Sequence, residues 1–365
     1  MSQFPEHTIE NTKCDMLKSE PKLVQADTLR RSFDQVLAAL KVDKTAAHHV
    51  IEGLVQTSLR GVDSHGIRLF PHYAKVVKAG RVNGHPNYQF HKGGNSVGRL
   101  DADHTYGHAA GAEAMKYVLD MARQTGCGAV AVFNSSHFGA AAYCGLMAAD
   151  KDMIGISLTH ADALTLATGG IRAFFGTNPI CVTAPVEGEG PFCLDMATSI
   201  ITWNKVKMHR EAGLALAPGL AADSKGESTT DPHAAESVFP IGDYKGFGLG
   251  MVVDILCGLL SGMPFGREIT SMYLTPLEQK RYLGQFYLAL DISKFQDVKV
   301  FKSRLRKYMD EIRREPARDP AKPVMVPGDP EKKAFIRRSR EGIPLSPYEF
   351  EAIAETCRQY SVTFP

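Results

Sequence analysis

The sequence predicts an α/β protein with two domains, and three observations carry that prediction. The chain has 365 residues, more than the roughly 250–300 at which a single hydrophobic core stops growing. Short apolar runs of strand character alternate with helical segments between residues 108 and 197. The shares of hydrophobic and charged residues, 44% and 22%, are ordinary for a globular protein. We therefore expect a loose tail at 1–22, a helical domain built from 23–105 and 260–365, and an α/β domain at 106–259.

Two helices are predicted after the tail. Asp27 can cap a helix over 28–40, and Asp43 can cap a second helix over 44–59. Gly61 suits the left-handed conformation with which helices often end. The second helix therefore stops where the polar stretch RGVDSHGIR begins.

The middle of the chain alternates helices and strands. Helices are predicted over 108–124 and 139–150. Strands fit the apolar runs at 128–133, 153–159, 180–186 and 192–197. Polar residues stand at the C-terminal ends of these strands, and α/β sheets commonly bind their ligands at that edge.

The last third of the chain returns to helices. From Gly246 the stretch FGLGMVVDILCGLLSG is mostly apolar, which predicts a buried helix. The elements expected after it are a strand over 283–292, helices over 297–314, 331–341 and 347–360, and a Pro-rich loop over 316–330.

Bulk properties exclude several classes of partner. The net charge is +2, and the basic cluster at 332–338 fits the solvated side of a helix better than a nucleic-acid-binding face. No apolar run approaches the about 18–20 residues that span a bilayer, and the polar start is no secretory signal. The seven cysteines include no CxxC and fit reduced thiols in a cytoplasmic protein.

Two histidines stand in positions that suit chemistry. His65 lies in a loop flanked by glycines, and an imidazole with an unperturbed pKa of about 6.5 suits a proton donor or acceptor. His137, in NSSHFGA, follows the predicted strand at 128–133 and precedes a helix. Each stretch is also compatible with a surface turn.

Asp195 interrupts the apolar strand FCLDMA. Aspartate is depleted in strands and rarely buried without a partner, so Asp195 either holds a histidine in place or caps a helix that begins near Thr198. The glycines from 246 onward do not form the GxGxxG of a Rossmann phosphate loop, although Lys245 before a helix suits a phosphate or ribose. No HExxH, Cys/His cluster or GxSxG occurs, so no metal and no serine hydrolase are predicted.

Eight segments in register carry a family resemblance. They are GVDSHGIRLFPHY, NSSHFGAAAY, GTNPICVTAP, FCLDMATS, TWNKV, TTDPHA, YKGFGLGMVVDILCGLLSGMPFG and VPGDPE. In this order they resemble the malate/L-lactate dehydrogenase family of nicotinamide-dependent oxidoreductases, which is unrelated to the Rossmann-type dehydrogenases. The resemblance implies the sulfolactate-dehydrogenase-like fold, with the cofactor on the α/β domain, the substrate on the side of the helical domain, and a homodimer.

The resemblance also implies roles for single residues. His65 and His137 match histidines proposed as proton donor or acceptor, and Asp195 matches an aspartate that lies beside the cofactor and supports the catalytic histidine. Ser64 and Arg68 would bind the substrate. The other positions at which the family contacts the dinucleotide are Met196, Ala197, Lys245, Gly246, Pro327 and Gly328.

The implied reaction is hydride transfer between NAD, with NADP as the other possibility, and C2 of a small 2-hydroxy or 2-oxo acid such as malate, lactate or ureidoglycolate. Arg68 stands one residue earlier than the corresponding arginine of many relatives, so Arg60, Arg267 or Arg281 can replace it as the carboxylate anchor. Two alternatives stay open. One is a cyclic imine reductase of the piperideine-2-carboxylate type on the same scaffold, and the other is a binding protein that retains the fold.

Overall fold

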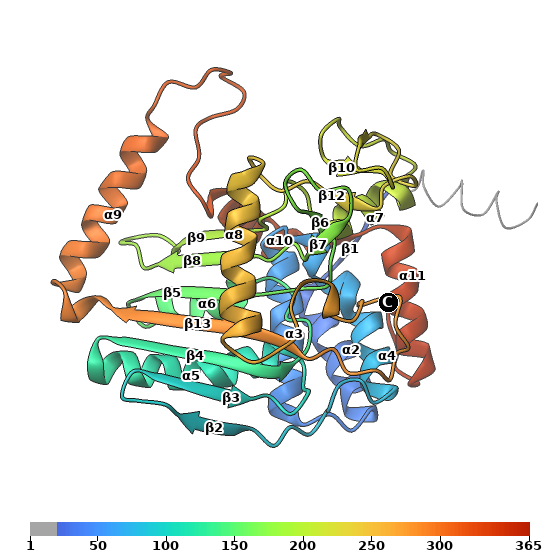
Figure 1. The fold of residues 1–365 in the computed structure, drawn as a ribbon, viewed down its shortest axis with the longest axis horizontal. Coiled ribbons are helices and arrows are strands. Elements are labelled where there is room, and N and C mark those ends of the chain that lie inside the picture. Colours follow the sequence, from blue (N-terminus) through green and yellow to red (C-terminus); the bar gives the residue numbers. More distant parts are fainter. Residues whose placement is uncertain (1–19) are drawn as a thin grey trace, which may run out of the picture.

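A computed structural model describes residues 20–365 (Figure 1), and it confirms the predicted α/β class. Residues 1–19 of the predicted tail lie outside the described part. The centre is a seven-stranded sheet of order β2-β3-β4-β13-β5-β8-β9. Its strands are β2 (Gln89–Lys92), β3 (Val97–Asp101), β4 (Cys127–Ser135), β5 (Met153–Thr159), β8 (Ile180–Ala184), β9 (Phe192–Met196) and β13 (Leu283–Asp291).

Strand direction decides which residues share an edge of this sheet. Most pairs are antiparallel, because β13 runs between β4 and β5, and β8 runs between β5 and β9. As a result β3, β4, β5 and β9 all point the same way. The polar residues predicted at their C-terminal ends therefore gather at one edge, as they would in a parallel sheet.

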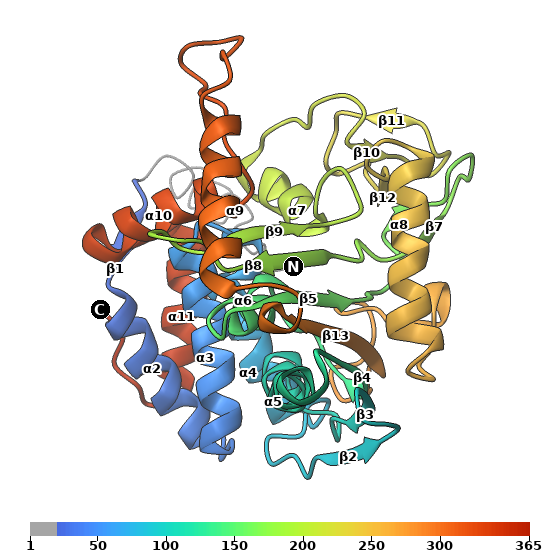
Figure 2. The same cartoon turned by 90° about the vertical axis from the view of Figure 1, so that its left-hand side faces the viewer.

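Helices cover both faces of the sheet. On one face lie α5 (Gly107–Thr125) and α6 (Ala142–Ala149), where a Cβ on Gly155 of β5 would come within 2.6 Å of the Ala148 side chain. On the other face, α8 (Tyr244–Asp254) continues into a π-helical turn at Ile255–Leu259 (Figure 2). A Cβ on Gly284 of β13 would come within 1.7 Å of the Cys257 carbonyl oxygen, so only glycine permits this close packing.

A separate helical core stands beside α5 and α6. It contains α2 (Ala26–Ala39), α3 (Lys44–Leu59), α4 (Phe70–Lys78) and α11 (Pro347–Gln359), with the two-stranded sheet of β1 (Lys22–Val24) and β14 (Ile343–Leu345). Leu29, Phe33, Leu54 and Phe70 are fully buried in it, and the rings of Phe33 and Phe70 are stacked. The division into domains stays a prediction. Within it, β13 comes from the segment assigned to the helical domain and lies in the middle of the large sheet.

A smaller layer covers the edge of the large sheet at which the polar residues gather. It is a five-stranded sheet of β6 (Thr165–Leu166), β7 (Ala173–Phe175), β10 (Ala221–Ala222), β11 (Ser228–Thr229) and β12 (Ser237–Val238). Helix α7 (Trp203–Ala212) packs on it around the buried Val206. The chain ends with α9 (Val298–Arg313) and α10 (Asp329–Glu341) before β14 and α11.

The expected strands and helices all occur, with ends that differ by a few residues. Asp43 caps α3 as predicted, accepting hydrogen bonds from the N–H groups of Thr45 and Ala46. Gly61 adopts the left-handed conformation, with φ +82°. The predicted cap Asp27 is wrong: α2 begins at Ala26, and Asp27 inside its first turn pairs with Arg30 instead.

The prediction of a fully buried helix after Gly246 is also wrong. One side of α8 and its π-helical turn packs on the sheet, where Val253 and Cys257 are fully buried. The opposite side is exposed, and its apolar side chains are Leu249, Met251, Val252, Ile255, Leu259 and Leu260. We call these six residues the α8 face. A run that is apolar all round predicts burial on every side, and within one chain this helix meets a neighbour on one side only.

Candidate active site

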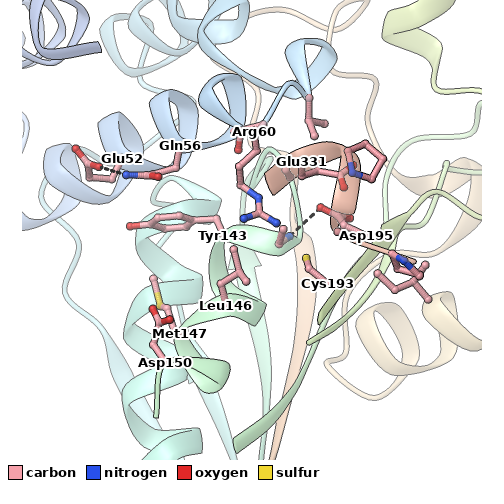
Figure 3. Close-up of a pocket in the computed structure, with 18 of the residues that line it drawn as sticks. Glu52, Gln56, Arg60, Tyr143, Leu146, Met147, Asp150, Cys193, Asp195 and Glu331 are labelled. Carbon is pink, nitrogen blue, oxygen red and sulfur yellow. Dashed lines mark hydrogen bonds between the residues drawn. The ribbon is translucent and has the colours of Figure 1, made fainter. Parts of the chain in front are cut away.

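Two cavities meet the edge at which β3, β4, β5 and β9 end. The first, which we call the histidine cavity, has a volume of about 800 Å³ and contains His65 and His137 among its lining residues. The second, which we call the Arg60 cavity, has a volume of about 770 Å³ and contains Arg60 and Asp195 (Figure 3). Of the sequence-predicted site residues, His65 and His137 line the first cavity, and Asp195, Pro327 and Gly328 line the second. The others line neither cavity, and they are Ser64, Arg68, Met196, Ala197, Lys245 and Gly246.

Two loops separate the cavities. Arg60 and Val62 line one cavity, and His65, three residues further along, lines the other. In the same way, His137 lines the histidine cavity and Ala140 lines the Arg60 cavity. A group that spans both cavities therefore passes the loops at 60–65 and 137–140.

His65 lies in a short 3₁₀ turn, Asp63–His65, directly after α3. The Ser64 hydroxyl oxygen is 3.0 Å from His65 Nδ1, and the Ser64 carbonyl accepts a hydrogen bond of 2.8 Å from Asn204 of α7. Burial, followed by the charge of Arg68, lowers the pKa of His65 to about 4. The ring is therefore neutral near pH 7 and is able to accept a proton.

His137 follows β4 and stacks on His65, with ring centroids 5.8 Å apart and planes 19° apart. Its Nδ1 is 2.7 Å from the Tyr73 hydroxyl and accepts the Gly139 N–H over 3.4 Å. Because Nδ1 is an acceptor, the proton of the neutral ring is on Nε2. Burial, together with the neighbouring His65, lowers the pKa of His137 well below its usual range.

Two arginines near the histidines, Arg68 and Arg281, already have partners in the protein. Arg68 is not among the lining residues: its Nη2 pairs with Glu211 at 2.9 Å and its Nε is 3.7 Å from Glu349. Arg281 pairs with Asp162 and donates to the Thr270 carbonyl. These carboxylate and carbonyl contacts already occupy part of each guanidinium.

Four further cations line the histidine cavity itself, namely Arg172, Lys207, Arg210 and Arg267. Arg210 donates to the carbonyls of Pro232 and Ala235. Arg267 donates from Nε to the Ala173 carbonyl at 2.8 Å. The Lys207 ammonium lies 3.1 Å from the centroid of the Tyr273 ring, and burial lowers the pKa of Lys207 to about 8. Near pH 7 Lys207 therefore remains largely protonated, as the binding of an anion requires.

Asp195 faces α6. Its Oδ2 accepts the Ala142 N–H over 2.9 Å, at the first residue of that helix (Figure 3). Within the described chain this is the hydrogen bond of the Asp195 carboxylate, so neither the expected contact with a histidine nor a cap near Thr198 is formed. Burial raises the pKa of Asp195 to about 6, against the opposing effects of the Ala142 N–H and Arg60.

The residues expected to contact the dinucleotide lie in or beside strand β9 and just beyond its end. The Pro327 carbonyl accepts the Cys193 N–H over 3.5 Å, so the turn at Pro327 and Gly328 lies beside the middle of the strand. Gly328 has φ +96°, a conformation that favours glycine. Asp195 and Met196 are the last two residues of β9.

The line of expected cofactor contacts, which we call the track, continues past the end of β9. After Ala197, the Thr198 carbonyl accepts the Ile241 N–H over 2.9 Å. A Cβ on Gly246 would come within 2.6 Å of that same carbonyl, so the first turn of α8, with Lys245 and Gly246, lies against the chain here. Three segments that are distant in sequence thus meet along one extended stretch of about 17 Å between residues 193 and 198.

The position of Arg60 in the Arg60 cavity was not predicted from the sequence. Its Nη2 is buried and has no hydrogen-bond partner among the described residues. The sequence offered Arg60 only as an alternative anchor for a substrate carboxylate, and the structure places it beside Asp195 instead (Figure 3). Sequence reasoning also missed Tyr73 and Lys207, although both lie within segments that carry the family resemblance, GVDSHGIRLFPHY and the stretch after TWNKV.

Residues 20–365 contain neither a cluster of metal-binding side chains nor a helix that could span a membrane. No group of three or more His, Cys, Asp or Glu side chains in that range is arranged to hold a metal ion. None of the helices there is both long enough and apolar enough to cross a bilayer.

Comparison with known proteins identifies relatives over almost the whole chain. The sequence model of the family described as malate/L-lactate dehydrogenase matches residues 24–354. Malate dehydrogenase from Pyrococcus abyssi is 34% identical over 349 residues, 93% of this chain and 95% of that protein. Ureidoglycolate dehydrogenase (NAD(+)) from Escherichia coli O157:H7 is 32% identical over 289 residues, 79% of this chain and 82% of that protein. The crystal structure of malate dehydrogenase from Entamoeba histolytica aligns with a TM-score of 0.90 and 28% identity, covering 95% of this chain and 100% of that one.

Proposed function

Because the chain belongs to the malate/L-lactate dehydrogenase family, we propose that it oxidises a small 2-hydroxy acid, or reduces the corresponding 2-oxo acid, with NAD as its cofactor. The observation that carries the proposal is the stacked pair His65 and His137, which lines one cavity directly beside a second cavity lined by Asp195 and the Pro327–Gly328 turn. One cavity fits a small acid and the other fits a dinucleotide.

Features of the second cavity fit a dinucleotide. The turn at Pro327 and Gly328 lies beside β9 in this cavity, and Met196, Ala197, Lys245 and Gly246 lie beyond its lining, along the continuation of that strand. The Nη2 of Arg60 has no hydrogen-bond partner among the described residues and is available to an anion. Asp195, Met196, Ala197, Lys245, Gly246, Pro327 and Gly328 would hold the cofactor. When bound, NAD accepts a hydride from C2 of the hydroxy acid.

His65 and His137 would have different roles at the substrate oxygen. Neutral His65, with Ser64 at Nδ1, would take the hydroxyl proton as the carbonyl forms, and in the reverse direction would return it. The Nε2–H of His137 would donate a hydrogen bond to the same oxygen and stabilise its charge. Tyr73 and the Gly139 N–H fix the His137 ring in the tautomer that this task requires.

A carboxylate of the substrate needs a cation within reach of the histidines. Lys207 lines the histidine cavity and its ammonium has no carboxylate partner among the ion pairs of the described residues, so we assign it the carboxylate together with Arg68 behind it. Arg68 Nη1 is buried without a partner, which leaves one side of its guanidinium available despite Glu211. This pairing keeps the predicted Arg68 and adds the residue that the sequence did not single out.

The α8 face supports a homodimer. Leu249, Val252, Ile255 and Leu259 are each more than 40% exposed, and they follow one another at helical spacing to form a stripe that the described part of the chain leaves uncovered. Gly248 lies within it, and a Cβ there would meet no atom within 4 Å, so a second copy of the helix is able to approach closely.

The test of the proposed function is absorbance at the reduced-nicotinamide band. Purified protein would be mixed with NADH or NADPH and pyruvate, oxaloacetate, sulfopyruvate or piperideine-2-carboxylate, and with NAD and malate or ureidoglycolate. Turnover with one hydroxy or oxo acid supports the proposal, and Lys207→Met should then raise KM for that acid more than it changes kcat. Turnover of the cyclic imine alone would contradict the substrate class.

A further inference from the structure

Arg60 lines the Arg60 cavity, and hydrogen bonds fix its backbone. It ends α3, where its N–H donates to the Gln56 carbonyl over 3.0 Å. The chain then turns through Gly61, whose N–H donates to Ser58, and Val62, whose N–H donates to Thr57 over 3.1 Å. The Arg60 side chain therefore leaves a backbone that is fixed on both sides.

The guanidinium that this backbone presents has no hydrogen-bond or ion-pair partner within residues 20–365. Among residues 20–365, no carboxylate lies within ion-pair distance of Arg60, and no acceptor receives a hydrogen bond from its side chain. A partly buried cation that forfeits water without gaining a partner lowers stability. Such a group is retained at a site where a ligand supplies the missing anion.

The lining of the cavity limits what that anion is. Apart from Arg60 and His48, the lining side chains that carry charge near pH 7 are carboxylates, namely Glu52, Asp150, Asp195 and Glu331. Figure 3 shows Arg60 between Tyr143 and Asp195, with Glu331 on the Asp195 side and Glu52 and Asp150 on the Tyr143 side. Glu52 stands eight residues before Arg60 on α3, which is about 12 Å along the helix axis. Glu52 is itself paired with Arg30, whose Nε is 2.7 Å from Glu52 Oε1. Among the described lining residues Arg60 is thus the permanent cation to which a phosphate can bind.

We propose that Arg60 binds the diphosphate of the nicotinamide cofactor, an inference that rests on the proposed function. Arg60 is five residues before His65 in one loop, so it lies at the end of the cavity nearest the reacting groups. In a nicotinamide dinucleotide the diphosphate comes before the adenosine, and the 2′-phosphate of NADP belongs to the adenosine end. Arg60 therefore serves the group that NAD and NADP share.

Binding constants of cofactor fragments test this assignment without any turnover. Dissociation constants would be measured by calorimetry for NADH, NADPH, ADP-ribose and adenosine, with wild type, Arg60→Gln and Arg60→Lys. Because Arg60→Gln removes a charge-assisted pair, it should weaken the binding of NADH and of ADP-ribose about 10- to 100-fold. The binding of adenosine should not change, because adenosine has no phosphate. Arg60→Lys keeps the charge and should recover part of the loss. Arg123→Gln, which removes an exposed arginine of α5, is the matched control and should bind all four ligands like wild type.

Each other outcome overturns the assignment in a different way. If Arg60→Gln and Arg60→Lys both bind NADH and ADP-ribose as tightly as wild type, Arg60 does not contact the diphosphate. A loss confined to NADPH would place Arg60 at the 2′-phosphate. A raised KM for the acid substrate with unchanged NADH binding would make Arg60 a substrate residue. If wild type itself binds neither NADH nor NADPH, the proposed function fails along with the role of Arg60.

Discussion

Arg338 and Asp63 form a two-pronged ion pair, with Nη1 to Oδ1 at 2.5 Å and Nη2 to Oδ2 at 2.9 Å. Nη1 of Arg338 also donates to the Ser58 carbonyl over 2.6 Å. Asp63 is two residues before His65, and α10, which carries Arg338, begins at the turn of Pro327 and Gly328. One helix therefore holds the histidine loop near its C-terminal end and follows the expected cofactor turn at its start.

Breaking this pair should weaken both the fold and the histidine loop. Arg338→Gln leaves Asp63 without its cation in a partly buried position, and we expect the free energy of unfolding to fall by about 1–3 kcal/mol. Urea unfolding measures it. The double variant with Asp63→Asn should cost less than the sum of the single variants. Arg337→Gln, at an exposed neighbour, is the control and should change little; equal losses at both positions would contradict the role of the pair.

Loss of the imidazole at position 65 should affect chemistry and spare cofactor binding. His65→Ala removes the proton acceptor, and we expect turnover to fall on the order of 10²–10⁴-fold. The dissociation constant for NADH should stay close to that of wild type, because the ring lies in the histidine cavity. Steady-state kinetics and calorimetry together check both points. Full activity in this variant would refute the role of His65.

The pH dependence of oxidation should reflect the lowered pKa of His65. The neutral ring is the acceptor and is populated above its pKa of about 4, so kcat/KM for the hydroxy acid should be nearly constant between about pH 6 and 8 and fall only toward pH 4. Asp195, with a pKa raised to about 6 by burial, is the other group that titrates in this range. The profile is therefore measured in wild type and in Asp195→Asn. A bend near pH 6.5 in both proteins would mean that the histidine titrates as an exposed imidazole.

Asp195 should cost stability near neutral pH. Its pKa of about 6 in the folded chain exceeds the about 3.9 of an unfolded one. A raised pKa stabilises the fold below the unfolded value, and that contribution is lost as pH rises through the folded value. Asp195→Asn should therefore be more stable than wild type at pH 7 by up to about 3 kcal/mol, equally stable near pH 4, and less active. Urea unfolding at both pH values decides this; a difference that does not depend on pH would contradict it.

A charge on the α8 face should separate the proposed dimer. Val252→Glu places a carboxylate in the middle of the apolar stripe, where pairing with a second copy would desolvate it. Sedimentation velocity should then report a monomer in place of a dimer. Ile336→Glu, at a 62% exposed residue of α10, is the control and should leave the dimer intact. A wild-type protein that sediments as a monomer would overturn the homodimer.

The local elements could be predicted because local patterns determine them. Short apolar runs located β4, β5, β8 and β9, and the cap at Asp43 and the left-handed Gly61 fixed where α3 begins and ends. His137 and Asp195 were also expected at one edge of the sheet, because α/β sheets commonly bind ligands where their strands end. That argument assumes parallel strands, and most neighbouring strands of this sheet are antiparallel. β13 and β8 run against the other strands, and the edge is shared because each lies between two strands of the same direction.

The contacts that span the chain could not be predicted. Nothing near Asp195 in sequence indicates that its partner is the N–H of Ala142, 53 residues earlier. In the same way, the acids around Arg60 come from α3, α6, β9 and α10, so no single stretch shows that this arginine is left unpaired. The apolar run of α8 was misjudged because sequence alone does not distinguish a face covered by its own chain from one that is free.

The place of β13 has a consequence for how the chain reaches its native state. During synthesis β4 and β5 leave the ribosome more than a hundred residues before the strand that separates them, Leu283–Asp291. Until then each presents an open strand edge, which is a template for wrong pairing. Completing the sheet requires closure of a long loop, a step that slows folding. The large sheet is therefore completed only late in synthesis, after Leu283–Asp291 has emerged.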